Sequence, residues 1–126
     1  MLRKAEHIGI MVKDLERSVA FYRDVLGLSL IEQISFNKLR LAFFRIGDTE
    51  IELIEGGSGY EAADGVVNHV AFSVDDIDAV VAHLKANGVQ MIDQTPREIW
   101  GGCRIAFFRG PDGEKLELFQ RPQGRR

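Results

Sequence analysis

Two histidines and two glutamates occupy equivalent positions in two similar parts of this 126-residue chain. His7 and His69 each open a short apolar stretch, whereas Glu52 and Glu117 each lie in the middle of another. A carboxylate among apolar strand residues is costly unless water, an opposite charge or a metal compensates it. Two neutral imidazoles and two carboxylates can neutralise a divalent cation and leave octahedral positions open for water or substrate. These four residues are therefore candidate metal ligands.

The equivalence of the four residues rests on an internal repeat. Identical and apolar positions recur in the same order at a nearly constant offset, which predicts two modules at about 5–56 and 67–121 within a single domain, 1–126. The intervening segment from Gly56 to Gly65 is rich in glycine and is expected to be a linker. The aligned landmarks are His7 with His69, Gly27 with Gly88 after a one-residue gap, 40–45 (RLAFFR) with 104–109 (RIAFFR), and Glu52 with Glu117.

Each module is predicted to fold as βαβββ, which makes the chain an α+β protein. Asp14 and Asp76 are suited to cap the starts of the two helices, and Gly27 and Gly88 stand where the helices should end. The expected strands are 7–12, 28–36, 39–46 and 49–55 in module one, and 69–74, 89–93, 103–109 and 114–120 in module two. The helix covers one face of each sheet, so the other face needs the second module, a partner subunit or a ligand.

Strand alternation places the candidate ligands on that second face. Ile8, Ile10 and Val12 are suited to face the helix, which directs His7 to the opposite, concave face. The apolar neighbours of Glu52 and Glu117 imply the same for the carboxylates. A lone histidine at a strand start is more often a surface or core residue, and a lone Glu52 could simply face solvent. The repeated pairing is what favours a metal site.

Other residues with chemical potential have simpler interpretations. Cys103 follows two glycines at the start of an apolar stretch and is expected to be buried rather than nucleophilic. His83 is expected on an exposed helix face, and Asp75 with Asp76 to form a turn and cap. Trp100 could cover substrate or pack at an edge. In 43–44 and 107–108 one phenylalanine ring should enter the core and the other face the concave surface. Candidates for binding an anionic substrate, if they are not simply solvated, are Arg40, Arg45, Arg97, Arg104 and Arg109.

Composition narrows the function classes. A net charge of −3 gives no reason to expect a nucleic-acid partner. The N-terminal segment has no apolar signal region and no stretch is long enough to span a membrane, while the single cysteine fits a reducing compartment. We therefore expect a cytoplasmic protein without a membrane or nucleic-acid partner.

Four segments together resemble the vicinal oxygen chelate superfamily, which includes glyoxalase I and methylmalonyl-CoA epimerase. They are EHIGIMVKDLERSVAFYRDVLGLSL, IELIE, NHVAFSVDDIDAVVAHLKANGV and FFRGPDGEKLELFQ. The resemblance implies a cupped, mixed β-sheet with helices on its outer face. It places metal ligands at His7, Glu52, His69 and Glu117, for nickel, zinc, cobalt, manganese, magnesium or iron. A full set of four is similar to glyoxalase I and the epimerase rather than to metal-free bleomycin-binding relatives.

The resemblance also implies a reaction. A glyoxalase I-like lyase or isomerase would act on a small 2-oxo compound or its thiol adduct through a metal-stabilised enediolate. Glu117 matches the catalytic base, with Glu52 as its pseudo-symmetric partner. No convincing glutathione-binding or CoA signature is present. Two alternatives remain open, namely an epimerase with the same ligands and a non-catalytic small-molecule binding or resistance protein. A homodimer is expected, with ligands from one chain or from two.

Overall fold

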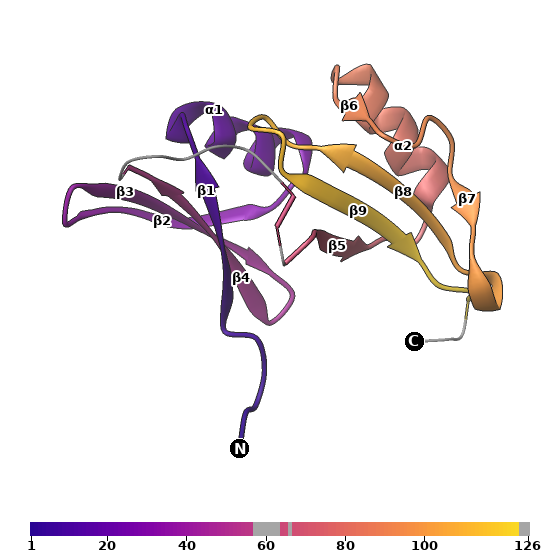
Figure 1. Cartoon of the computed structure of the whole chain (residues 1–126), viewed down its shortest axis with the longest axis horizontal. Coiled ribbons are helices and arrows are strands. Elements are labelled where there is room, and N and C mark those ends of the chain that lie inside the picture. The colour runs from indigo at the N-terminus through magenta and orange to yellow at the C-terminus, as the bar shows by residue number, and fades with distance from the viewer. Residues whose placement is uncertain (57–63, 66, 124–126) are drawn as a thin grey trace. The chain divides into compact units, whose positions relative to one another are not determined.

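The computed structural model describes residues 1–56, 64–65 and 67–123, except for the side chain of Phe36. Most of the expected linker therefore lies outside the described residues. The chain divides into two compact units, Met1–Glu61 and Ala62–Arg126. Each unit contains one copy of the repeat, and we refer to them as module one and module two (Figure 1).

Module one contains a four-stranded sheet in the order β1-β4-β3-β2. Strand β1 runs parallel to β4, and the remaining neighbours are antiparallel. Because a parallel pair needs a crossover connection, the helix and two strands lie between β1 and β4 in the sequence. The elements are β1 (His7–Val12), α1 (Leu15–Ala20), a π-helical turn (Phe21–Val25), β2 (Ser29–Phe36), β3 (Leu39–Ile46) and β4 (Thr49–Glu55).

Module two repeats this arrangement, with β5-β9-β8-β6 as its order and β7 also paired to β8. Strand β5 is parallel to β9, and the other pairs are antiparallel. The α+β class and the mixed sheets are thereby confirmed. The elements are β5 (Val70–Ser73), α2 (Ile77–Ala86), β6 (Gln90–Met91), β7 (Arg97–Glu98), a 3-10 turn (Trp100–Gly102), β8 (Arg104–Arg109) and β9 (Lys115–Gln120).

The predicted length of the strand at 89–93 is wrong. Only Gln90 and Met91 form it, and the two-residue strand β7 continues the edge of the sheet. The cause is Asp93, whose carboxylate accepts the backbone N–H of Phe107 at 2.8 Å and so replaces a backbone carbonyl at that position. When a side chain accepts a hydrogen bond that a backbone carbonyl would otherwise accept, the regular pairing of the two strands is interrupted.

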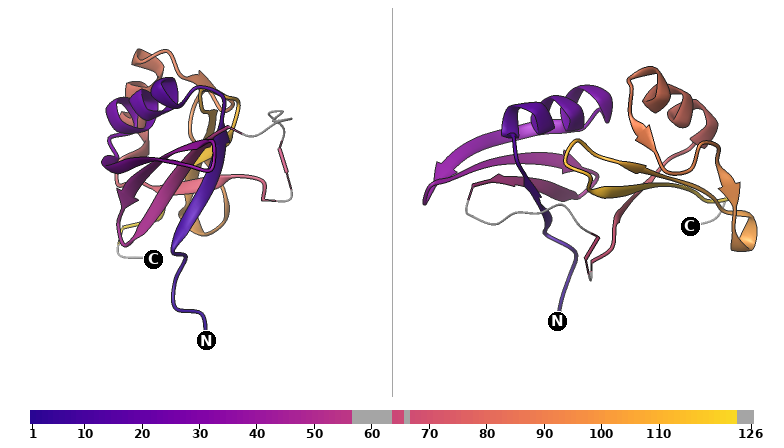
Figure 2. Two further views of the ribbon diagram at one scale, coloured as in Figure 1. Left: turned by 90° about the vertical axis from the view of Figure 1, so that its left-hand side faces the viewer. Right: turned by 45° about the horizontal axis from the view of Figure 1, so that its top comes forward.

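The helix starts are built alike in the two modules. Asp14 caps α1 and Asp76 caps α2, each by accepting a backbone N–H three residues on at 3.1 Å. The last residue of the final strand binds the first N–H of the helix, from Leu15 to Glu55 and from Ile77 to Gln120, both at 2.7 Å. These contacts fix each helix to the strand that carries the candidate glutamate. Figure 2 shows each helix lying across one face of its own sheet.

The cores lie between helix and sheet. Module one buries Leu15, Val19 and Tyr22 from the helical segment against residues such as Phe44 and Leu53. Module two uses Ile77, Val81 and Leu84 in the same way. The π-helical turn after α1 accommodates the extra residue that the repeat shows before Gly27, since a π-turn holds one residue more than an α-turn. Neither described helix has the length and apolar character required to cross a membrane.

Candidate metal centre

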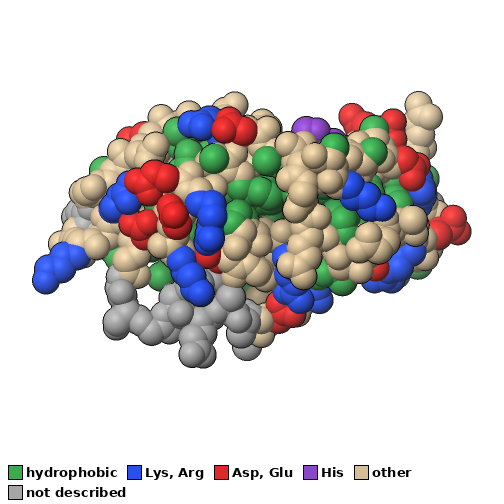
Figure 3. Space-filling model, turned by 90° about the horizontal axis from the view of Figure 1, so that it is seen from above, with side chains coloured by type: hydrophobic (Ala, Val, Ile, Leu, Met, Phe, Trp, Pro, Cys, Tyr) green, Lys and Arg blue, Asp and Glu red, His purple; other side chains and the backbone are tan. Residues whose placement is uncertain are grey.

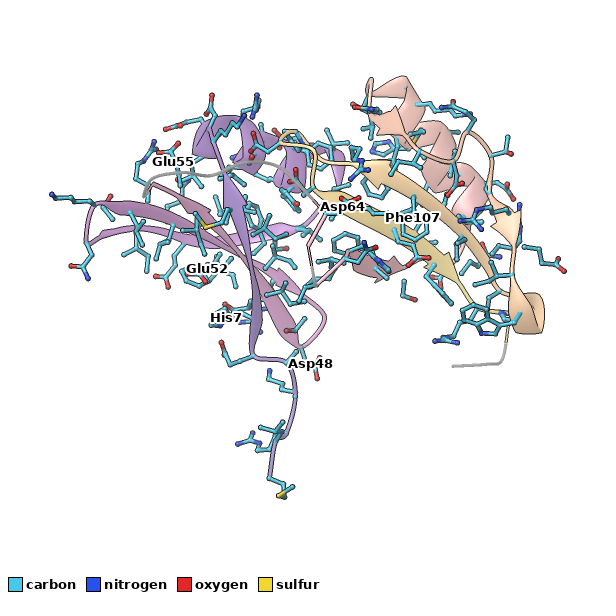
Figure 4. All side chains as sticks on the ribbon, viewed as in Figure 1. His7, Asp48, Glu52, Glu55, Asp64 and Phe107 are labelled. Carbon is cyan, nitrogen blue, oxygen red and sulfur yellow. The ribbon has the colours of Figure 1, made fainter. Side chains whose placement is uncertain are left out.

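The first candidate pair joins neighbouring strands of module one. His7 opens β1, and Glu52 lies opposite Gly9 in the parallel register of β4. Because Gly9 is two residues after His7, both side chains emerge on the same face. The imidazole Nε2 lies 3.4 Å from Glu52 Oε1, as the two labelled side chains in Figure 4 illustrate.

The second pair has the same construction in module two. His69 immediately precedes β5, and Glu117 lies opposite Ala71 in β9. The imidazole Nε2 is 3.0 Å from Glu117 Oε1. The structure therefore brings each predicted histidine to the predicted glutamate of its own module, giving two equivalent His–Glu pairs.

The geometry of each pair fits two ligands of one cation. Two donors bound at right angles, each about 2.1 Å from a metal, are separated by about 3 Å. The observed separations of 3.0 and 3.4 Å lie close to this value. The other ring nitrogen is also engaged, since His7 Nδ1 lies 2.7 Å from Glu6 Oε1 and His69 Nδ1 lies 2.9 Å from Asn68 Oδ1. Such outer contacts orient metal-binding imidazoles and direct Nε2 to the ion.

The side chains of the two glutamates are shielded from solvent. The side chain of Glu52 is 15% exposed and that of Glu117 is 7% exposed. Their strand neighbours Ile51, Leu53, Leu116 and Leu118 are buried on the helix side, as the alternating pattern predicted. The Glu6 carboxylate, hydrogen-bonded to Nδ1, raises the pKa of His7 above its usual value, and the nearby charge of Glu52 adds to this.

A phenylalanine ring stands beside each pair. Phe43 lies opposite Glu52 in the β3–β4 ladder and meets His7 edge-on at 6.3 Å between ring centroids. Phe107 lies opposite Glu117 and meets His69 edge-on at 5.0 Å. Their sequence neighbours, Phe44 and Phe108, are fully buried. One ring of each FF pair therefore enters the core and the other lines the candidate site, as expected.

The arginines proposed for anion binding all have carboxylate partners. Basic and acidic side chains accordingly lie close together over much of the face seen in Figure 3. These pairs leave the five guanidinium groups engaged rather than available for a ligand. They are Arg40 with Glu16 and Glu55, Arg45 with Glu50, Arg97 with Asp93, Arg104 with Asp78, and Arg109 with Asp64.

A group of three acidic residues, Asp14, Glu16 and Glu55, is also close enough to hold a cation. However, Glu55 already binds the start of α1, and Arg40 forms ion pairs with Glu16 and Glu55. The group is therefore explained as a helix-start network. Elsewhere, Cys103 is buried as expected, His83 is exposed, and Trp100 is 75% exposed at its turn.

Sequence reasoning missed three residues near the pairs. Glu6 and Asn68 directly precede the two histidines, and their matched positions in the repeat were the available signal. Lys115 lies two residues before Glu117 on the same strand face, and its ammonium stands 4.9 Å from the centroid of the Phe107 ring. Strand alternation could have identified it.

Two βαβββ modules that each present a His–Glu pair define a duplicated protein with a candidate metal centre. The profile of the Glyoxalase/Bleomycin resistance protein/Dioxygenase superfamily matches residues 4–118. The chain belongs to this superfamily.

Three relatives illustrate the range within the family. The chain is 39% identical to the uncharacterized protein YwbC of Bacillus subtilis, over 96% of this chain and all of that protein. It is 36% identical to a probable lactoylglutathione lyase of Vibrio cholerae, over 93% and 90% of the two chains. Among solved structures, the fosfomycin resistance protein FosX of Listeria monocytogenes gives a TM-score of 0.78 at 28% identity, over 98% and 97% of the chains.

Proposed function

We propose that the protein is a metal-dependent, glyoxalase I-like lyase or isomerase that acts on a small 2-oxo compound or its thiol adduct. The observation that carries this proposal is the pair of matched His–Glu contacts at 3.0 and 3.4 Å, one in each module. The similarity to a probable lactoylglutathione lyase supports the reaction class.

His7, Glu52, His69 and Glu117 would hold the divalent ion, which could be nickel, zinc, cobalt, manganese, magnesium or iron. When bound, the ion would supply Lewis-acid stabilisation of negative charge on adjacent substrate oxygens. Each module has only two of the four ligands, so we treat the two modules as one functional domain. We further propose a cytoplasmic homodimer, in which the two pairs that complete a site belong to one chain or to two.

Glu117 is the proposed base. It removes the proton from the carbon beside the carbonyl and returns it to the neighbouring carbon. Its side chain is 7% exposed and lies beside the Phe107 ring, which limits the access of water to the carboxylate. Glu52 would add negative charge at the metal centre.

The first test is metal binding by the full chain. Titration calorimetry with Ni²⁺, Co²⁺, Zn²⁺ and Mn²⁺ should give about one ion per chain, and His69→Ala and Glu52→Ala should each weaken binding at least about tenfold. His83→Ala is the matched control, because His83 is an exposed histidine on α2 and should leave binding unchanged. Equal affinity in H69A, E52A and H83A would remove the metal site from these residues.

The second test separates the activities. Loss of the methylglyoxal–glutathione hemithioacetal, followed by absorbance, would identify the glyoxalase reaction. Exchange of a thioester α-proton into heavy water would identify the epimerase instead. Fosfomycin binding without either reaction would favour a resistance protein, to which the similarity with FosX points. The proposal expects the first result.

A further inference from the structure

The β8–β9 hairpin of module two differs in charge from its counterpart in module one. Arg109 and Lys115 are directly opposite each other across the hairpin. The equivalent residues in module one, Arg45 and Glu50, are also opposite each other and form an ion pair at 3.7 Å. Module one thus neutralises this position within its own ladder, whereas module two places two cations there.

Among the described residues, Arg109 has a carboxylate within ion-pair distance and Lys115 does not. Arg109 donates to Asp64 Oδ1 at 2.6 Å and to the carbonyl of Gly113 at 3.1 Å. In the described part of the chain, no carboxylate oxygen lies within ion-pair distance of the Lys115 ammonium. Asp64 therefore faces two cations: it pairs with Arg109, and the nearby charge of Lys115 also lowers its pKa, so the three groups together leave one net positive charge. Phe107, on β8 of this hairpin, and Asp64 are labelled in Figure 4.

The ammonium of Lys115 is held at the candidate site rather than extended into solvent. It stands over the Phe107 ring at 4.9 Å, and that ring meets His69 edge-on at 5.0 Å. A cation over an aromatic face is stabilised, which biases the position of a flexible side chain. The ring therefore links the lysine to the imidazole of the His69–Glu117 pair.

The spacing along β9 gives the reach of this charge. Lys115 precedes Glu117 by two residues on the same face, which corresponds to about 7 Å along a strand. This is the spacing of the two Cα atoms, and it places both side chains on one face within the span of a small substrate. A single uncompensated positive charge suits a singly charged anion better than a doubly charged one.

We infer that Lys115 is a specificity-determining residue that selects substrates bearing a carboxylate in addition to the reacting oxygens. The inference rests on the proposed function and names the substrate class, namely a small 2-oxo compound or adduct with a terminal carboxylate. The five arginines singled out in the sequence have their own carboxylate partners and do not share this role.

One experiment uses metal-loaded protein and a matched pair of chelators. N-hydroxysuccinamic acid and butanohydroxamic acid both offer adjacent oxygens, but only the first adds a terminal carboxylate. The wild type should bind the anionic compound about five- to tenfold more tightly, which is the range of an exposed to half-buried charge contact. Lys115→Met should abolish this preference, and Lys115→Arg should keep most of it. Lys85→Met, which changes an exposed lysine of α2, is the control.

A second experiment does not depend on metal. Butanoate and butanamide are titrated into the metal-free chain while the backbone amide signals of Lys115 and Phe107 are followed by NMR. Butanoate should shift these signals at lower concentration than butanamide, and K115M should remove the difference. Circular dichroism of K115M checks that the fold is retained.

The two experiments distinguish the failure of the two proposals. If the hydroxamates bind but the wild type shows no preference for the one with a carboxylate, the proposed role of Lys115 is overturned. The same holds if K115M keeps the full preference. Where no hydroxamate binds, the metal-dependent proposal fails and the NMR titration decides alone. Equal responses to butanoate and butanamide would then overturn the role of Lys115, whereas a difference that requires Lys115 would support it.

Discussion

The two modules share one plan, yet module two holds its His–Glu pair closer and more shielded than module one. The Nε2–Oε1 separation is 3.0 Å in module two and 3.4 Å in module one, and the glutamates are 7% and 15% exposed. The adjacent phenylalanine is also closer, at 5.0 Å compared with 6.3 Å.

The neighbours of the pairs differ more than the pairs themselves. Glu6 in module one is replaced by Asn68, and Glu50 by Lys115. Module one therefore surrounds its histidine with negative charge, which suits the retention of a cation. Module two combines a shielded carboxylate with a nearby lysine, an arrangement that supports the proposed role of Glu117 as the base. The two modules therefore share the same candidate ligands but differ in the residues around them.

The largest predicted effect tests the assignment of the base. With metal saturating, Glu117→Gln should lower kcat for the hemithioacetal by about 10²–10⁴, the usual contribution of a positioned base. Glu52→Gln should lower kcat at least about tenfold less and act mainly on metal affinity. Steady-state kinetics at a series of metal concentrations would measure both. Equal losses of kcat would show that the two modules have not diverged in this role.

The next effect concerns the end of the final strand. Gly56 has φ +128°, and a Cβ there would lie 2.9 Å from the carbonyl oxygen of Lys38. Gly56→Ala should therefore lower the free energy of unfolding by about 1–3 kcal/mol. Urea denaturation of the metal-free chain would measure it. Arg121→Ala, at the equivalent position of module two, should cost about 0.5–1 kcal/mol through its contact with Phe119. A larger loss of unfolding free energy in R121A than in G56A would contradict this expectation.

A smaller effect comes from the helix starts. Glu55 offers a carboxylate to the first N–H of α1, whereas Gln120 offers an amide oxygen to α2. Negative charge at a helix N-terminus stabilises by about 0.3–1 kcal/mol at low salt. Glu55→Gln should therefore destabilise and Gln120→Glu stabilise by about that amount, and both effects should shrink in 1 M salt. Thermal unfolding at two salt concentrations would show whether the signs are opposite, as expected.

The smallest effect is a pH dependence. The hydrogen bond that His7 donates to the Glu6 carboxylate raises the pKa of His7 and lowers the pKa of Glu6. A raised pKa in the folded state stabilises at low pH and loses that contribution as pH rises through the folded value. The stabilising window therefore extends from the lowered pKa of Glu6 to the raised pKa of His7.

Glu6→Gln should bring the pKa of His7 back toward its usual value, as NMR titration of the metal-free chain would show. Glu50→Gln is the matched control, because Glu50 raises the pKa of His7 less than Glu6 does. A larger shift in E50Q than in E6Q would contradict the hydrogen bond as the main cause.

Much of the fold and the ligand pairing could be predicted from the sequence, because both follow from local periodicity applied twice. Alternation of apolar residues placed Glu52 and Glu117 opposite the core, and the repeat matched each with a histidine. Alternation also separated Phe43 from Phe44 correctly, since only Phe44 is fully buried.

Other features depend on contacts that periodicity does not encode. Asp93 ends its strand by a side-chain hydrogen bond to a residue 14 positions away. The pairing of Arg104 with Asp78 and of Arg109 with Asp64 likewise joins segments distant in the sequence. Without knowledge of those partners, the sequence pointed to the arginines as anion ligands, and Lys115 was not considered. The joint geometry of the two His–Glu pairs stays a prediction.

The parallel pairing of β1 with β4, and of β5 with β9, has a consequence for biosynthesis. The first strand of each module leaves the ribosome well before the strand that flanks it, because the helix and the intervening strands are translated in between. Long-range parallel pairing forms late and slowly. Each imidazole therefore meets its carboxylate only when the module closes, so the His–Glu pairs form only after folding of each module is nearly complete.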